Sequence, residues 1–212
     1  LAQTPLVRYK HGVEVRPTSV LRSDCECTLE RRDDGEPALR LGLRLVKSLS
    51  RVGAERIVAA RVAGGTFSSV QDLTVRAALG RGGLEALADA GVLRELTGNR
   101  HLAFWEVAGS ECELPLAPRA ARDEATPLIV PPTEGQNIVA DYRALGLTLG
   151  RHPVALLRGK MVHDQMLPAA ELVHAKHGAP VRVAGTRLLL EPGDDWSRGW
   201  PIVTAADGVA SM

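Results

Sequence analysis

The residues best suited to chemistry in this chain stand at a predicted sharp turn, Ser48-Leu49-Ser50. An apolar anchor, Val46, precedes the turn, and a helix with Ala54 and Ile57 on its inner face follows it. This is the layout of a helix-hairpin-helix. Two short helices that meet at such a hairpin leave the first backbone N–H groups of the second helix unpaired. Together with the helix dipole, these N–H groups form a phosphate site.

Serine occupies both turn positions where the usual form of this hairpin, Gly-hydrophobic-Gly, has glycine. Glycine lets a phosphate oxygen approach the backbone because no side chain stands in the way. Ser50 can still cap the second helix through its hydroxyl, and both serines are small enough to leave the amides reachable. The residues expected to frame a phosphate are Lys47, Ser48, Ser50, Arg51 and Gly53.

Basic residues gather around this turn. Between positions 39 and 61, only Glu55 opposes a set of six cations, Arg40, Arg44, Lys47, Arg51, Arg56 and Arg61. A basic run beside exposed amides suits a polyanion whose base sequence is not read. The same run is also typical of a solvated basic face on an ordinary helical pair. The charge pattern alone leaves both interpretations open.

A second unit of similar size follows, with a predicted turn at Gly80-Arg81-Gly82-Gly83 and a helix that breaks near Gly91. Two such units should pack face to face and bury Ala54, Ile57, Leu73, Leu84 and Leu87. The glycine-rich turn is a second candidate phosphate contact, with Arg81 at its tip; the alternative is a turn without a ligand. The full predicted contact set is Arg44, Lys47, Ser48, Leu49, Ser50, Arg51, Gly53, Gly80, Arg81, Gly82 and Gly83.

The chain as a whole is nearly neutral. Its 212 residues include 26 basic and 25 acidic side chains, so any nucleic-acid footprint must be local. Aromatic residues make up only 3% of the chain, which predicts a core of Leu, Val and Ala. No apolar run approaches the ~20 residues of a membrane span, and the start lacks the pattern of a signal peptide. We therefore expect a cytoplasmic location and no membrane partner.

No residues have the spacing of a catalytic or metal site. Three cysteines, Cys25, Cys27 and Cys112, are too few for a disulfide framework, and the first two lack the second pair of a zinc site. The histidines at 163, 174 and 177 have no Cys, Asp or Glu cluster to complete a ligand shell. We expect no catalytic residue, no metal and no cofactor in this chain.

Several separate segments of the chain follow one another in an order known from one family. They are residues 41–47, 54–58, 67–73 and 84–93, with 11–17 and 23–30 upstream and 141–149 and 151–153 downstream. Together they resemble the tandem helix-hairpin-helix region of bacterial C-family DNA polymerases and its flanks. The chain is most similar to the error-prone, damage-induced paralogue of the replicative alpha subunit. The resemblance covers about residues 8–184.

The resemblance implies a fragment that binds the duplex DNA backbone without reading sequence, within an error-prone polymerase of damage-induced mutagenesis and translesion synthesis. The family's nucleotidyl transfer takes place in a palm far upstream, where paired carboxylates hold two Mg²⁺ ions. No segment here resembles that palm, so the chain alone is not expected to catalyse the reaction. The alternative is a protein-interaction fragment that docks accessory mutagenesis proteins without DNA contact. Residues 111–116 correspond to a sliding-clamp peptide of the replicative relative but lack its glutamine and aromatic ending.

We predict an α+β, mainly α fold in five parts. These are a remnant of a fingers-like region (1–37), a tandem helix-hairpin-helix domain (38–110), a Pro-rich linker (111–135), a short helical connector (136–160) and a partial OB-like segment with an incomplete sheet (161–212). Phe104 and Trp105 should pack against the hairpin units. Ile138, Val139 and Tyr142 should share the apolar side of the connector helix.

Overall fold

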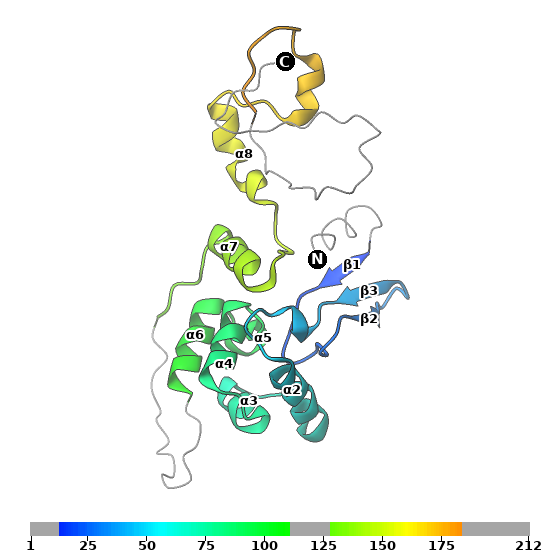
Figure 1. The fold of residues 1–212 in the computed structure, drawn as a ribbon, viewed down its shortest axis with the longest axis vertical. Helices are drawn as coiled ribbons and strands as arrows, with labels where there is room; N and C mark the ends of the chain where they lie inside the picture. Colours follow the sequence, from blue (N-terminus) through cyan, green and yellow to red (C-terminus); the bar gives the residue numbers. More distant parts are fainter. Residues whose placement is uncertain (1–12, 111–127, 184–212) are drawn as a thin grey trace. The chain divides into compact units, whose positions relative to one another are not determined.

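The computed structural model describes residues 13–110 and 128–183 (Figure 1). The chain divides into two compact units, Leu1–Gly150 and Arg151–Met212. Most of the described elements belong to the first unit, where a small sheet lies beside a group of helices. The predicted α+β, mainly α class is confirmed.

A three-stranded sheet opens the first unit. Its strands are β1 (Glu14–Arg16), β2 (Thr28–Arg31) and β3 (Pro37–Arg40), in the spatial order β1-β3-β2. β1 runs parallel to β3, and β2 runs antiparallel to it. The boundary predicted between residues 37 and 38 falls inside β3. The helix-hairpin-helix layout predicts a short helix before the turn at Ser48, but this region is strand β3 followed by the short 3₁₀ turn η1 (Leu43–Leu45).

Six α-helices complete the part of the first unit that the structure describes. They are α2 (Arg51–Gly64), α3 (Val70–Ala77), α4 (Arg81–Asp89), α5 (Arg94–Thr97), α6 (Arg100–Gly109) and α7 (Glu134–Leu145). Polar N-caps start most of them: Ser50, Ser69, Asn99 and Thr133 each accept a hydrogen bond from a backbone N–H of the following turn. Gly91 has a φ of 69°, a left-handed conformation that ends the α4 region as predicted.

One apolar cluster joins η1 to helices α2, α3, α4, α6 and α7. The five residues predicted to be buried, Ala54, Ile57, Leu73, Leu84 and Leu87, are all at most 2% exposed. Their burial confirms that the two hairpin units pack face to face. Leucine, valine and alanine provide most of this cluster, as the scarcity of aromatic residues predicted.

The prediction for the helix aromatics was wrong. Phe104 is 37% exposed and Trp105 is 47% exposed, because α6 turns Ala103 and Val107 toward the core instead. On α7, Ile138 is buried as predicted, whereas Val139 and Tyr142 are exposed. The smaller residues thus form the packing faces, which allows these helices to approach one another closely.

Helix α7 is an integral part of the first unit. Its Ala144 lies in the main apolar cluster, its Arg143 forms an ion pair with Asp89 of α4, and Leu147 just beyond it packs with Val15 and Leu41. The chain divides into its two units after Gly150, within the predicted connector 136–160.

The second unit contains helix α8 (Pro153–His163), which begins with Pro153 as predicted, and the 3₁₀ helix η2 (Ala169–His174). Leu167 and Val183 form an isolated parallel bridge. Residues 184–212 of the predicted OB-like segment and the clamp-like stretch 111–116 lie outside the described residues. Among the described residues, no helix is both long and apolar enough to cross a membrane.

A cluster of charged side chains links the three strands of the sheet. Glu30 of β2 accepts hydrogen bonds from Arg40, which is only 5% exposed, and from Arg16. The hydrogen bond from Arg40, with smaller contributions from Arg16, lowers the pKa of the Glu30 carboxyl from 4.5 to about 2. The charged form of Glu30 therefore holds β2 against β3.

This cluster predicts a stability loss in acid. A carboxyl whose pKa is lower in the folded state stabilises the fold above its unfolded pKa, and the contribution is lost as pH falls through the folded value. We expect the free energy of unfolding to decrease from pH 4.5 down to about 2, and Glu30→Gln to remove part of that decrease. Glu36→Gln is the matched control, because Glu36 forms no ion pair within the described part of the chain. An identical acid dependence in Glu30→Gln would contradict the assignment.

Candidate nucleic-acid interface

Two turns of the same construction precede α2 and α4. Ser48-Leu49-Ser50 leads into α2, and Ala78-Leu79-Gly80 leads into α4. The first residue of each turn is left-handed, with φ of 66° at Ser48 and 48° at Ala78, and the third is an extended N-cap. The molecule thus contains the same turn twice.

The position predicted for the second turn was wrong. We predicted it at residues 80–83, but Gly80 is the N-cap and Arg81, Gly82 and Gly83 already belong to the first turn of α4. The glycines signalled a turn in the sequence, whereas Ala78 takes the left-handed position that glycine usually fills. Sequence reasoning missed Ala78 and Leu79. The signal that could have found them is the repeat Leu49-Ser50-Arg51 and Leu79-Gly80-Arg81.

The two turns touch each other. A methyl group placed on Gly53 would lie 3.3 Å from Leu49 Cδ1 and 3.4 Å from Leu79 Cδ2, and on Gly83 the same leucine atoms would lie 3.8 and 3.9 Å away. Both leucines therefore cover both glycines. This contact sets the starts of α2 and α4 side by side, so the two predicted phosphate sites form one surface.

Each helix start leaves two consecutive backbone N–H groups without a backbone acceptor among the described residues. In α2, Ser50 Oγ accepts a hydrogen bond from the Gly53 N–H at 3.0 Å, which is the cap predicted for Ser50. The N–H groups of Arg51 and Val52 have no backbone acceptor within the described residues. In α4, the Gly83 N–H donates to the Gly80 carbonyl at 3.0 Å, while those of Arg81 and Gly82 have no such acceptor there. Val52 was absent from the predicted set.

An arginine occupies the first position of both helices. The side chains of Arg51 and Arg81 are 80% and 75% exposed, and each Nε donates to a glutamate four residues later, Glu55 or Glu85, at 2.9 Å. The hydrogen bond that Arg51 donates to Glu55 raises the pKa of the Arg51 guanidinium. Neither helix has an acidic residue in its first turn, in contrast to Asp72 in α3. The positive end of each helix dipole is therefore reinforced rather than neutralised.

Lys47 contacts the end of α7. Its backbone N–H donates to the Ala144 carbonyl at 2.8 Å, and its ammonium donates to the Tyr142 carbonyl at 3.3 Å. These are carbonyls of the last turn of α7, where a cation is favourable. Lys47 thus ties the first turn to α7, across a long sequence separation that no local pattern reveals.

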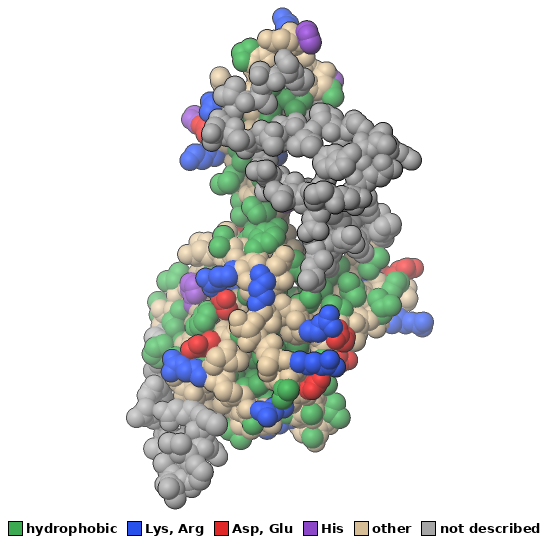
Figure 2. All heavy atoms as spheres, in the orientation of Figure 1, with side chains coloured by type: hydrophobic (Ala, Val, Ile, Leu, Met, Phe, Trp, Pro, Cys, Tyr) green, Lys and Arg blue, Asp and Glu red, His purple; other side chains and the backbone are tan. Residues whose placement is uncertain are grey.

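Two further members of the predicted basic run also have structural roles. Arg40 is buried against Glu30, and Arg61 donates to the Val20 and Ser23 carbonyls and pairs with Asp24. Arg44 is exposed and pairs with Glu26 at 2.8 Å. Figure 2 shows Lys and Arg side chains interspersed with Asp and Glu on the visible face of the helices, and no large basic area there. The positive surface at the turns is therefore local.

The part of the chain that the structure describes contains no group of three or more His, Cys, Asp or Glu side chains placed to hold a metal ion. The Mg²⁺ that the resemblance implies for the polymerase family therefore has no fitting ligand set there. The described residues offer hydrogen-bond donors and positive charge at the two turns, which is the chemistry of anion binding.

Comparison with known proteins agrees with the geometry. A family model described as a helix-hairpin-helix motif matches residues 12–103. The chain is 51% identical over 176 residues to the Error-prone DNA polymerase of Alkalilimnicola ehrlichii, and 43% identical over 177 residues to that of Pseudomonas aeruginosa. Both matches cover 83% of this chain and 17% of the relative. The chain thus matches a segment of error-prone DNA polymerases and spans about a sixth of their length, which confirms the predicted resemblance.

The turn geometry predicts a stabilising substitution. Ala78 is left-handed, a conformation that costs a residue with a Cβ roughly 1–2 kcal/mol and costs glycine almost nothing. Part of this gain is offset because glycine has more conformational freedom in the unfolded chain. We expect Ala78→Gly to raise the free energy of unfolding by about 0.5–1 kcal/mol, measured by urea denaturation.

Ala59→Gly is the control for this substitution. Ala59 is exposed in the interior of α2, where glycine should cost about 1 kcal/mol. Equal destabilisation by both substitutions would show that the turn does not require a left-handed residue.

Proposed function

We propose that the paired turns bind the sugar–phosphate backbone of duplex DNA without reading base sequence. The observation that carries this proposal is the contact between two like turns, each of which presents two consecutive N–H groups at a helix start. A helix start of this kind is a ready anion site. Two such sites on one rigid surface suit a ligand with regularly repeated phosphates.

Charge at the turns supports the same ligand. Arg51 and Arg81 place a guanidinium beside each pair of amides, and both side chains reach into solvent. These groups would contact phosphates rather than base edges, so they would position the duplex without selecting a base sequence. The predicted set is revised accordingly: Arg51, Val52, Arg81 and Gly82 supply the backbone donors, and Lys47 and Gly53 support them.

We further propose that this segment holds DNA for an error-prone polymerase that acts in damage-induced mutagenesis and translesion synthesis. Support comes from the matched relatives, which carry the name Error-prone DNA polymerase, and from the helix-hairpin-helix match. Nucleotidyl transfer in such a protein would belong to the palm expected outside this segment. The segment's own contribution is to hold the duplex.

A second candidate function is docking of accessory mutagenesis proteins or of the sliding clamp. The exposed aromatic side chains of α6 favour it, because Phe104 lines a hollow with Pro132 and Val139. Exposed aromatic side chains are frequent anchors in protein interfaces. Docking through this face does not involve the turns, so the two functions can be tested separately.

Salt dependence tests the DNA-binding proposal. Each phosphate contact adds about −0.9 to the slope of log affinity against log salt for duplex DNA. The double variant Arg51→Gln, Arg81→Gln should weaken duplex binding and make the slope shallower by about 1.8, measured by fluorescence anisotropy on duplexes of unrelated sequence.

Arg32→Gln is the control for the double variant, because Arg32 pairs with Glu14 and Asp34 beside the sheet. An unchanged duplex affinity of the double variant at low salt would favour the protein-docking function. The wild-type chain should also bind duplex more tightly than an equal length of single strand.

Substitution of Lys47 should change duplex binding in a different way from substitution of Arg51 and Arg81. Lys47→Gln should lower the free energy of unfolding by about 1 kcal/mol and weaken duplex binding, because the first turn loses the side-chain hydrogen bond to Tyr142 and keeps only the backbone bond to the end of α7. The salt slope should stay at the wild-type value, since no phosphate contact is lost, and Lys47→Arg should restore affinity. A slope that becomes shallower by about 0.9 in Lys47→Gln would instead make Lys47 a phosphate contact.

A further inference from the structure

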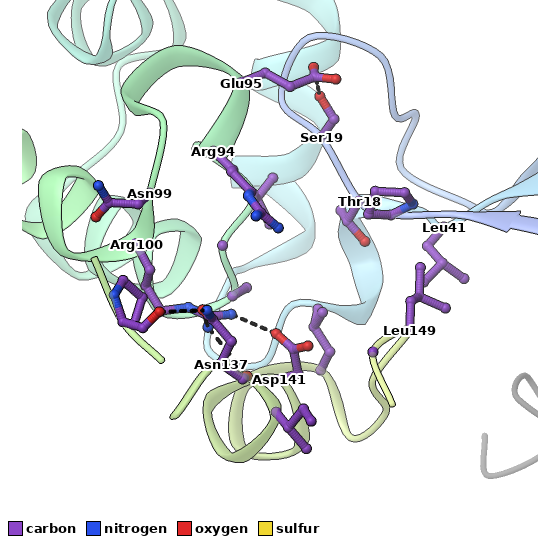
Figure 3. A pocket seen from close by; sticks show the side chains of 18 of the residues that line it. Thr18, Ser19, Leu41, Arg94, Glu95, Asn99, Arg100, Asn137, Asp141 and Leu149 are labelled. Atoms are coloured by element: carbon purple, nitrogen blue, oxygen red, sulfur yellow. Dashed lines mark hydrogen bonds and ion pairs between the residues drawn. The ribbon is translucent and has the colours of Figure 1, made fainter. Parts of the chain in front are cut away.

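A hollow of about 920 Å³ lies in the first unit, away from the two turns. Figure 3 shows it between the loop that carries Thr18 and Ser19, the loops flanking α5, and helix α7. None of the turn residues 47–53 or 78–83 lines it. Its apolar wall consists of Val15, Leu41, Ile138, Leu145, Leu147 and Leu149. Its size and mostly apolar lining are those of small-ligand sites.

Arg94 is the polar group best placed to meet a ligand. Figure 3 shows its side chain reaching from α5 into the space between Thr18 and Arg100. It is exposed and forms no hydrogen bond or ion pair within the described part of the chain. A guanidinium beside an apolar wall is poorly solvated on that side, so an anion there would be bound more strongly than at an open surface.

Two buried polar atoms in the same wall also lack a partner. Thr18 is 6% exposed and its Oγ1 has no hydrogen bond; Arg100 is 8% exposed and its Nε has none. The other nitrogens of Arg100 are engaged, with Nη1 donating to Asn137 Oδ1 and Nη2 to Asp141 Oδ1, both at 2.6 Å. Native proteins rarely leave such groups unpaired. The described part of the protein therefore leaves two hydrogen-bonding groups of this wall unsatisfied.

The acidic residues of the hollow do not neutralise Arg94. Glu95 accepts a hydrogen bond from Ser19 Oγ at 2.5 Å and pairs with Arg22 at 3.4 Å. Asp141 accepts from Arg100 and from Thr148 Oγ1 at 2.8 Å. Glu134 also has a partner of its own. Arg94 is thus the one lining side chain of the described residues with an uncommitted full charge.

We propose that this hollow binds a compact organic anion, in which a carboxylate, sulfonate or phosphate group is attached to an apolar or aromatic body. Arg94 takes the anionic group, and the leucine and isoleucine wall takes the apolar body. The anion-binding end then lies near the side of the hollow formed by Thr18 and Arg100, where partners are missing. This site does not depend on the proposed DNA binding, because the two share no residue.

The test uses two fluorescent probes of nearly equal shape. 1-Anilinonaphthalene-8-sulfonate carries a sulfonate, and N-phenyl-1-naphthylamine is its neutral counterpart. The wild-type chain should bind the sulfonate probe saturably at one site. Arg94→Gln should weaken that binding by about tenfold or more, as expected for a charge-assisted hydrogen bond, and should leave the neutral probe unchanged. Arg94→Lys should keep part of the affinity.

Two variants exclude other sources of fluorescence. Leu149→Trp fills the apolar wall and should weaken both probes, which separates the hollow from the non-specific dye binding of partly unfolded chains. Arg32→Gln removes a distant arginine and should change neither. Non-saturable emission, binding unaffected by Leu149→Trp, or equal effects of Arg94→Gln on the two probes would overturn the proposal. Loss of DNA binding in the arginine variants of the turns would leave this result untouched.

Discussion

The contact of Leu49 and Leu79 across Gly53 and Gly83 is the constraint on which the proposed interface depends. It leaves little room for a side chain at the third position of α2, because a Cβ on Gly53 would also lie 3.2 Å from Ser50 Oγ. At Gly83, the third position of α4, the same leucines would be at ordinary contact distance. With both leucines inserted, the starts of α2 and α4 lie side by side. The remaining packing, including the buried Ile57 and Leu87 one helical turn further on, follows from this placement.

The two turns reach the same result with different residues. In the first turn, Ser50 caps α2 because its hydroxyl accepts a hydrogen bond from the Gly53 N–H. In the second turn, the N-cap Gly80 has no side chain, and its backbone carbonyl accepts the hydrogen bond from the Gly83 N–H. In both cases the third N–H of the helix is satisfied internally and the first two are left. Replacing glycine by serine in the first turn therefore keeps the donor pattern, since the hydroxyl substitutes for a backbone acceptor.

The sequence predicted those features that depend on local pattern. Helical periodicity identified the buried residues, and the Ser50 cap and the Gly91 break followed from local backbone chemistry. Features that depend on distant partners were not predictable. The carbonyls that bind Lys47 belong to α7, and an exposed basic run has the same composition whether or not its members are engaged. The second turn was misplaced because glycine content was taken to mark the turn, while Ala78 adopts the left-handed conformation.

A cation at the start of a helix is itself informative. It opposes the helix dipole at a cost of about 0.3–1 kcal/mol, and α3 follows the usual preference with an acidic residue in its first turn. Arg51 and Arg81 break this preference at equivalent positions. Arg100 also stands first in α6, but it is buried and paired with Asp141, whereas Arg51 and Arg81 are exposed and each is offset only by a glutamate one turn later. A phosphate bound between the amides and the guanidinium would turn this repulsion into attraction. The position of Arg51 and Arg81 at the positive ends of the helices, unfavourable in the free chain, would therefore contribute affinity when an anion binds. This is the physical basis for proposing that both turns bind one polyanionic ligand.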